Sequence, residues 1–318
     1  MEMRATILDV AKAAGVSRQT VTRAMNDLPG ISAETRDRVL AAGERLGYRP
    51  SRFARNMARQ KSRSVGLTLL SLRNPYYSDL AADVIAAAAA RKVQVGISAS
   101  DRDSVLALAE QVDGLVGYFD LPDDEIRRLA RRIPLVLIER RVEGVHSVEL
   151  DFASGLRGFV DALIARGSRR FAFVDSLLGH SPSDYRPTAR REWLEQIVPG
   201  LRVIPAHESI GEAAAALAQL HRAEPHIDTV IAFSDIMAMG LLQGAHALGL
   251  RVPDDVRIAG IDGLALGEVM HPPLSTLSID RPAIASRSLR LLEESWMLSR
   301  DQRTREILVP APLLRASA

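Results

Sequence analysis

Arg18 and Gln19 are adjacent side chains whose hydrogen-bonding groups match base edges in the DNA major groove. Arginine can pair with guanine through two parallel hydrogen bonds, and glutamine can do the same with adenine. Both residues lie in the segment 17–26 (SRQTVTRAMN), which follows the segment 6–14 (TILDVAKAA) after a break at Gly15. The apolar residues of both segments have the spacing at which two crossing helices meet, which is typical of a helix-turn-helix. An ordinary helical hairpin shares this spacing, so the charge of the region is needed to distinguish it from a DNA-binding helix-turn-helix.

The basic residues are concentrated in the first fifth of the chain. Residues 1–63 contain 13 Lys+Arg and 6 Asp+Glu, whereas the remainder contains 28 and 33, although the whole chain has a net charge of only +2. A basic N-terminal region on a slightly acidic body indicates that only this region meets a polyanion. Each phosphate that it neutralises releases counterions and adds affinity. The charge therefore favours DNA binding over an ordinary hairpin.

A third helix is expected over residues 32–46, with Ser32 as its N-cap and an end at Gly47. Pro50 then breaks the chain. The next segment, 51–63, is rich in arginine and is long enough only for a short helix, which is marginal by itself in water. It would fold against a second chain or DNA, and is otherwise a solvated linker. The predicted division is a DNA-binding headpiece (1–49), a hinge (50–63) and a core (64–318).

From Ser64 onward, short apolar runs alternate with amphipathic helical stretches. This pattern predicts an α/β fold with parallel sheets covered by helices on both faces. About ten strands are expected, which exceeds one comfortable sheet, so we predict two doubly wound subdomains. Ligands bind such sheets beyond the carboxyl ends of the strands, here in the cleft between the subdomains.

Several classes of protein are disfavoured by what the sequence lacks. It has no cysteine, and it contains no nucleophile elbow, P-loop or HExxH motif. We therefore expect no catalytic residues, no metal site and no cofactor. The N-terminus MEMRATILDV has no apolar signal region, and no apolar run is long enough to cross a bilayer. These features predict a cytoplasmic protein with no membrane partner.

Seven stretches in order give the chain a resemblance to the LacI/GalR family of bacterial transcription regulators. The resemblance covers essentially the whole chain and is most specific in the headpiece. The stretches are DVAKAAGVSRQTVTRAMN, ISAETRDRVLAAGERLGYRP with ARNMA beyond it, SVGLTLLSLRNPYY, VDGLVGYF, LIARGSRRFAFV, AFSDIMAMGLLQGAHALGLRVPDDVRIAGIDG and PPLSTLSID. It implies a helix-turn-helix headpiece, a hinge helix, and a core similar in fold to periplasmic sugar-binding proteins.

The resemblance also implies how DNA is bound. A homodimer would place two recognition helices in successive major grooves of a palindromic operator, with Arg18 and Gln19 at the base edges. Met57 matches the position of an apolar wedge in the minor groove. For Arg23 and Asn26, solvation of a helix face is the alternative. The positions that match phosphate-facing or helix-orienting residues are Thr6, Ser17, Thr22, Arg23 and Asn26.

In the core, the resemblance implies an effector site for a small polar ligand such as a sugar. Asp262 follows an apolar strand, whereas Asp151 and Asp235 stand before helices, where an aspartate could simply be a cap. Arg190 is displaced by one position from the family's usual arginine, so its reach into the cleft stays open, with Arg186 as a substitute. The expected effector-binding residues are Asn74, Tyr76, Tyr118, Asp151, Arg190, Asp235 and Asp262.

The predicted function is a ligand-responsive repressor. A corepressor-type regulator that binds a nucleobase or another metabolite remains an alternative, and a solute-binding protein is a weaker one. Ser234 and Gly263 depart from the family's usual polar residues, which limits any prediction of the ligand. The segment between VQVGISA and VDGLV is also shorter than usual by about ten residues, so the geometry of the dimer could differ.

Overall fold

The computed structural model describes residues 6–25, 29–46, 63–177, 185–297 and 304–318. Asn26, Met57 and the predicted hinge helix lie outside these residues. Within the described residues, no helix is long and apolar enough to cross a membrane.

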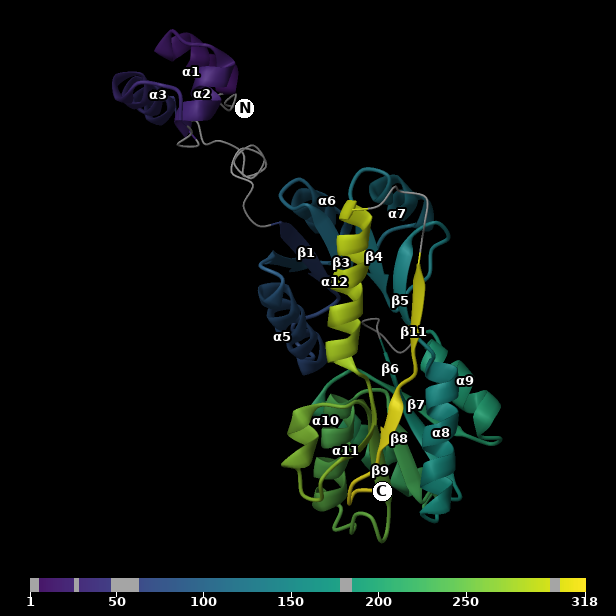
Figure 1. The fold of residues 1–318 in the computed structure, drawn as a ribbon. Helices are drawn as coiled ribbons and strands as arrows, with labels where there is room; N and C mark the ends of the chain where they lie inside the picture. The colour runs from purple at the N-terminus through teal and green to yellow at the C-terminus, as the bar shows by residue number, and fades with distance from the viewer. Residues whose placement is uncertain (1–5, 26–28, 47–62, 178–184, 298–303) are drawn as a thin grey trace.

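The headpiece is a bundle of three short helices: α1 (Ile7–Ala14), α2 (Arg18–Met25) and α3 (Ala33–Arg45) (Figure 1). Val10, Val21 and Val39 are fully buried where the helices meet. At the start of α1, Thr6 and Asp9 cap each other's backbone N–H groups. Gly15 ends α1 with a φ of 66°, a left-handed conformation that glycine adopts without steric cost.

The first core subdomain is built on a six-stranded sheet in the order β2-β1-β3-β4-β5-β11, whose neighbouring strands are all parallel. The strands in the middle of the sheet are almost continuously buried because helices cover both faces (Figure 1). The elements are β1 (Ser64–Leu69), α5 (Pro75–Ala90), β2 (Gln94–Ala99), α6 (Arg102–Ala109), β3 (Gly114–Gly117), α7 (Asp123–Ala130), β4 (Leu135–Ile138), β5 (His146–Leu150), α12 (Arg281–Met297) and β11 (Arg305–Leu308).

The second subdomain has a sheet in the order β7-β6-β8-β9-β10-β12, in which only β12 is antiparallel to its neighbour. The elements are α8 (Phe152–Ala165), β6 (Phe171–Ser176), α9 (Ala189–Ile197), β7 (Arg202–Ala206), α10 (Ile210–Ala223), β8 (Thr229–Ala232), α11 (Asp235–Ala247), β9 (Arg257–Asp262), the 3₁₀ turn η2 (Ala265–Glu268), β10 (Ser275–Ser278) and β12 (Ala311–Leu313).

The chain crosses between the two subdomains three times: after β5, after β10 and after β11. The prediction of two doubly wound subdomains is confirmed. The sequence did not predict β12, a three-residue strand that contains Pro312 and lies at the sheet edge. The shortened segment after β2 forms the eight-residue helix α6, and Ile97 of the edge strand β2 is 45% exposed.

Candidate functional site

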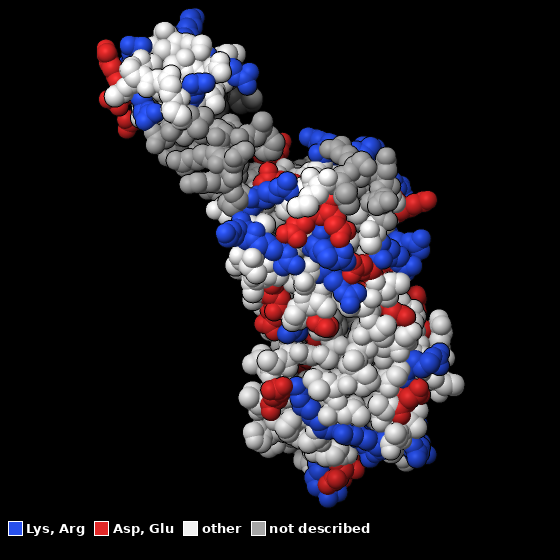
Figure 2. Space-filling model, viewed as in Figure 1, with Lys and Arg blue, Asp and Glu red and all other residues white. Residues whose placement is uncertain are grey.

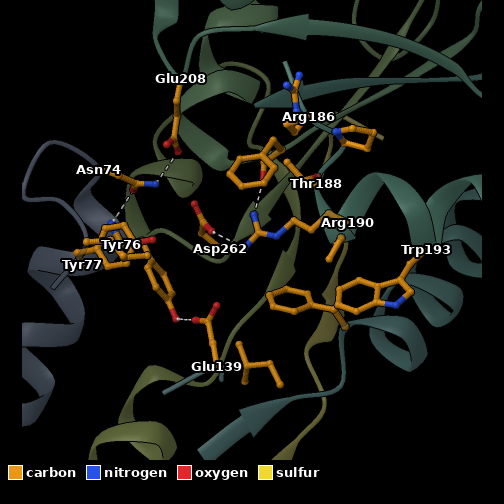
Figure 3. A pocket seen from close by; sticks show the side chains of 16 residues that line it. Asn74, Tyr76, Tyr77, Glu139, Arg186, Thr188, Arg190, Trp193, Glu208 and Asp262 are labelled. Atoms are coloured by element: carbon orange, nitrogen blue, oxygen red, sulfur yellow. Dashed lines mark hydrogen bonds and ion pairs between the residues drawn. The ribbon is translucent and has the colours of Figure 1, made fainter. Parts of the chain in front are cut away.

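A cavity of about 440 Å³ lies between the two subdomains (Figure 3). It opens beyond the carboxyl ends of the parallel strands, where ligands of such sheets bind. The first subdomain contributes Leu70, Asn74, Tyr76, Tyr77, Glu139 and Leu150; the second contributes Phe152, Arg186, Pro187, Thr188, Ala189, Arg190, Trp193, Glu208, Phe233 and Asp262.

On the first subdomain, two tyrosines hold the carboxylate of Glu139. Tyr118 Oη donates to Glu139 Oε1 at 2.6 Å and Tyr76 Oη donates to the same oxygen at 2.9 Å. Burial, followed by the neighbouring Glu139 carboxylate, raises the pKa of both tyrosines well above the usual value, so both remain protonated donors. Glu139 has a φ of 58°, and its position directly after β4 aims it at the cavity (Figure 3).

On the second subdomain, Arg190 lies between two aromatic rings. Its guanidinium carbon is 4.7 Å from the centre of the Phe152 ring and 4.4 Å from that of Phe233. The guanidinium also donates to the Phe233 carbonyl and pairs with Asp262 at 3.9 Å. Trp193, one turn further along α9, stacks on Phe152 with ring centres 6.0 Å apart. The wall therefore combines a flat apolar surface with a fixed cation.

Asp262 is the last residue of β9, lies beside Arg190, and is 2% exposed. Burial raises the pKa of its carboxyl well above the usual range, and the positive charge of Arg190 opposes this shift. Its φ of 139° is one that L side chains rarely adopt. Such strain persists only where surrounding contacts enforce it and is frequent at binding sites.

The two subdomains are joined directly across the cavity by Asn74 and Glu208. Asn74 is the N-cap of α5, and its Oδ1 accepts a hydrogen bond from Tyr76 N at 2.9 Å. Its Nδ2 donates to Glu208 Oε1 at 2.8 Å (Figure 3). Because the cap fixes the orientation of the amide, the NH₂ group is directed at the opposite subdomain.

Among the seven expected effector-binding residues, the structure brings Asn74, Tyr76, Arg190 and Asp262 together at the cavity, but not Tyr118, Asp151 or Asp235. Tyr118 is buried behind Tyr76 and contacts Glu139. Asp151 caps α8 through Ser154 N at 3.0 Å, while its neighbours in the chain line the cavity.

Asp235 is fully buried at the first turn of α11, where Ser234 rather than Asp235 is the N-cap. Its carboxylate accepts hydrogen bonds from Thr276 Oγ1 at 2.6 Å and Leu264 N at 2.7 Å. Burial raises its pKa. Asp235 therefore links the start of α11 to β10 and to the segment that follows Asp262.

Sequence reasoning missed Glu139, Glu208 and the stack of Trp193 on Phe152. For Glu139 a signal existed, because a charged residue directly after a buried apolar strand is the same pattern that singled out Asp262. Glu208 lies in the short connection between β7 and α10, and no local pattern distinguishes it from other surface acids.

In the headpiece, α2 buries Val21 and Ala24 and exposes Arg18 and Gln19. Neither of these two side chains has a hydrogen-bond or ion-pair partner among the described residues. Several Lys and Arg side chains are visible on the headpiece in Figure 2. The base-reading pair is thus presented to solvent on the helix that the sequence indicated.

The other predicted DNA-binding residues of the described headpiece make local contacts. Ser17 Oγ accepts a hydrogen bond from Thr20 N at 3.1 Å and so caps α2. Thr22 Oγ1 donates to the Arg18 carbonyl at 3.1 Å, and Arg23 Nη1 donates to the Pro29 carbonyl at 3.1 Å. Arg23 therefore braces the turn after α2 instead of only solvating a helix face.

The described part of the chain contains no group of three or more His, Cys, Asp or Glu residues that could hold a metal ion. The cavity instead offers hydroxyl, amide, carboxylate and guanidinium groups around an aromatic surface, which suits a small polar molecule. A helix-turn-helix on a two-subdomain binding core defines a ligand-responsive DNA-binding regulator.

Comparisons with known proteins agree with this class. The model for bacterial regulatory proteins of the lacI family matches residues 6–51, and the model for the periplasmic binding protein-like domain matches residues 160–318. Catabolite control protein A of Staphylococcus xylosus is 30% identical over 97% of each chain. A ribose operon repressor of Halalkalibacterium halodurans is 32% identical over 90% of this chain and 89% of its own.

Solved structures show the same fold. A LacI family transcriptional regulator from Arthrobacter sp. FB24 in complex with lactose matches with a TM-score of 0.74 and 28% identity, over 80% of this chain and 99% of its own. The lac repressor dimer bound to operator and the anti-inducer ONPF matches with a TM-score of 0.70 and 25% identity, over 99% of both chains. The chain belongs to the lacI family of bacterial regulatory proteins, and it is a transcriptional regulator.

Proposed function

We propose that this chain is a cytoplasmic homodimeric repressor whose affinity for a palindromic operator is switched by a sugar-like effector. The headpiece would comprise residues 1–49, the hinge 50–63 and the effector-binding and dimerisation core 64–318. The cavity is the observation that carries the proposal: it lies between two subdomains and pairs an aromatic stack with fixed polar groups. A ligand that contacts both walls changes the relative stability of their arrangements.

For DNA, we propose that Arg18 and Gln19 read bases, because both are exposed on α2 and neither side chain has a partner within the part of the chain that the structure describes. Thr6 and Ser17 lie at helix starts, where backbone N–H groups attract phosphate. Thr22 would contact phosphate from the middle of α2, and Arg23 would orient the turn after this helix. Asn26 and Met57 keep the phosphate-facing and minor-groove roles proposed from the sequence.

For the effector, we propose that Asn74, Tyr76, Arg190 and Asp262 contact the ligand and that Tyr118, Asp151 and Asp235 hold the walls in place. The face of a sugar ring is apolar and would lie on Trp193 or Phe152, while its hydroxyl groups pair with carboxylates and amides at the edges. The regulator from Arthrobacter sp. FB24 in complex with lactose and the relative named ribose operon repressor support this class of ligand.

Two measurements test the proposal. Selection from random DNA in physiological salt should recover a palindrome that binds at least about 10³-fold more tightly than unrelated DNA. A thermal-shift screen of neutral sugars, sugar phosphates and nucleobases should raise the melting temperature for a sugar. Recovery of no preferred sequence would overturn the proposed repressor function. A rise in melting temperature with nucleobases alone would overturn the proposal of a sugar-like effector.

A corepressor is the second candidate, because a ligand that closes the cavity could equally favour the DNA-bound state. The ligand identified in the screen distinguishes the two when it is added to the operator complex. Release of DNA identifies an inducer, and tighter binding identifies a corepressor.

A further inference from the structure

Helix α12 spans the first subdomain from the cavity to the point where the described core begins. It has 17 residues, Arg281–Met297, which corresponds to a length of about 25 Å. Its buried side chains, such as Leu289 and Leu292, pack in the core beside α5 and the first sheet. In Figure 1 the helix runs from the junction of the subdomains to the far end of this sheet. A packed helix of this kind moves as a unit.

At the cavity end, Arg281 contacts both subdomains. Its guanidinium lies 3.4 Å from Asp79 and 3.6 Å from Asp83, both on α5, whose first turn lines the cavity. The same side chain approaches the carbonyl oxygens of Asp262 at 3.4 Å and Gly263 at 3.5 Å, in the second subdomain. Only 13% of the side chain is exposed. Any movement of Asp262 relative to α5 therefore disturbs the contacts of Arg281.

At the other end, Trp296 contacts the first residues of the core. Its Nε1 donates to the Asp113 carbonyl at 3.0 Å, and the guanidinium carbon of Arg63 lies 4.4 Å above its ring. The carboxylate of Asp113 accepts hydrogen bonds from Ser64 N at 2.7 Å and Ser64 Oγ at 2.9 Å. The chain reaches the headpiece through the residues that precede Arg63, so this contact lies at the base of the connection.

We propose that Arg281 and Trp296 are positioning residues at the two ends of α12, through which the arrangement of the cavity walls controls the placement of Arg63. The proposal rests on the regulatory function proposed above and specifies its route inside the first subdomain. The physical reason is that Arg281 is shared between two bodies that a ligand moves, while α12 is one continuous packed helix that shifts along its whole length instead of bending. A small displacement at Arg281 is passed along the helix to the Trp296 ring.

The chain contains two tryptophans, Trp193 in the cavity and Trp296 beside Arg63. Removing Trp193 therefore leaves a fluorescence signal that reports on the surroundings of Trp296. The full-length W193F variant, in which Trp296 is the only tryptophan and is excited selectively over the tyrosines, is the parent for the test. Adding R63A defines the acrylamide quenching constant and emission maximum of an uncovered Trp296. Adding R281A should shift both quantities toward those R63A values. Adding R287A, a substitution of another arginine of α12 whose partner is Glu306, should leave them at the parent values.

Equal quenching in the parent, R281A and R287A variants would overturn the proposal, as would equal increases in R281A and R287A. If R281A does not fold, R281K replaces it, because lysine can reach one carboxylate but cannot span both subdomains. The same shift is expected for R281K, and quenching at the parent value would overturn the proposal. The readout needs neither operator nor effector, so its failure is distinguishable from failure of the proposed repressor function.

Discussion

Asn74 of the first subdomain donates a hydrogen bond of 2.8 Å to Glu208 of the second, although the two residues are 134 positions apart in the sequence. The bond lies at the cavity, and it depends on a helix cap, since the Oδ1 of the same amide is occupied by Tyr76 N. Asn74 thus caps α5 in the first subdomain and also links this subdomain to the second.

The N74D substitution should retain the cap of α5 but place two carboxylates at the position of the bond. Like charges repel, so the subdomains should separate and the radius of gyration from small-angle X-ray scattering should increase. In the N74D/E208Q double variant the glutamine amide can donate to the new carboxylate, and the radius should return to that of the unmodified protein. An unchanged radius in N74D would show that this bond does not hold the cavity closed.

Arg18 and Arg23 should respond differently to replacement by alanine, although both are on α2. R18A should leave the thermal stability unchanged, because the side chain has no partner among the described residues, and cost about 1–3 kcal/mol of binding at one base pair per half-site. R23A should lower the melting temperature, since it removes the donor to the Pro29 carbonyl. Competition binding with single-base operator variants separates the outcomes, and a uniform loss for R18A would make it a phosphate contact.

The stability contributed by Asp262 should depend on pH. Burial raises the pKa of this carboxyl well above its usual value, and the positive charge of Arg190 opposes the shift. A raised folded-state pKa gives a contribution that is complete below the unfolded value and is lost as the pH rises through the folded value. D262N mimics the protonated form, so its melting temperature relative to the unmodified protein should increase from about pH 4 to about pH 8. A constant difference over this range would contradict the raised pKa.

Tyr118 should contribute more to stability through its hydroxyl than Tyr77 does. Tyr118 is buried and donates to Glu139 at 2.6 Å, whereas the described residues give the Tyr77 hydroxyl no hydrogen-bond partner. Y118F should lower the free energy of unfolding by about 1.5–3 kcal/mol, the range for a hydrogen bond to a charged group. Urea denaturation measures this loss, with Y77F as the control of equal size. Equal losses in the two variants would indicate that the bond to Glu139 is not responsible.

Local sequence patterns were enough to predict most of the helices and strands and the class of the protein. Helices α1, α2 and α3 follow from local apolar spacing and from caps at Thr6, Ser17 and Ser32, which depend only on residues within a few positions. Runs such as that in β9 indicate parallel strands because both faces must be apolar, and the residue after such a run lies at the ligand-binding edge. Asp262 could be singled out for this reason.

Which of the polar residues face the cavity depends on long-range packing. The sequence favoured Asp262, whereas for Asp151 and Asp235 a helix cap was the alternative to a role in the cavity. The structure directs Asp151 to a helix cap, buries Asp235 under β9 and β10, and leaves Asp262 beside Arg190. Glu139, Glu208 and the bridging Arg281 acquire their partners from elements far away in the chain. Local patterns show which residues lie at the ends of strands and helices. Contacts between subdomains depend on how whole elements pack together, and no short-range pattern encodes this packing.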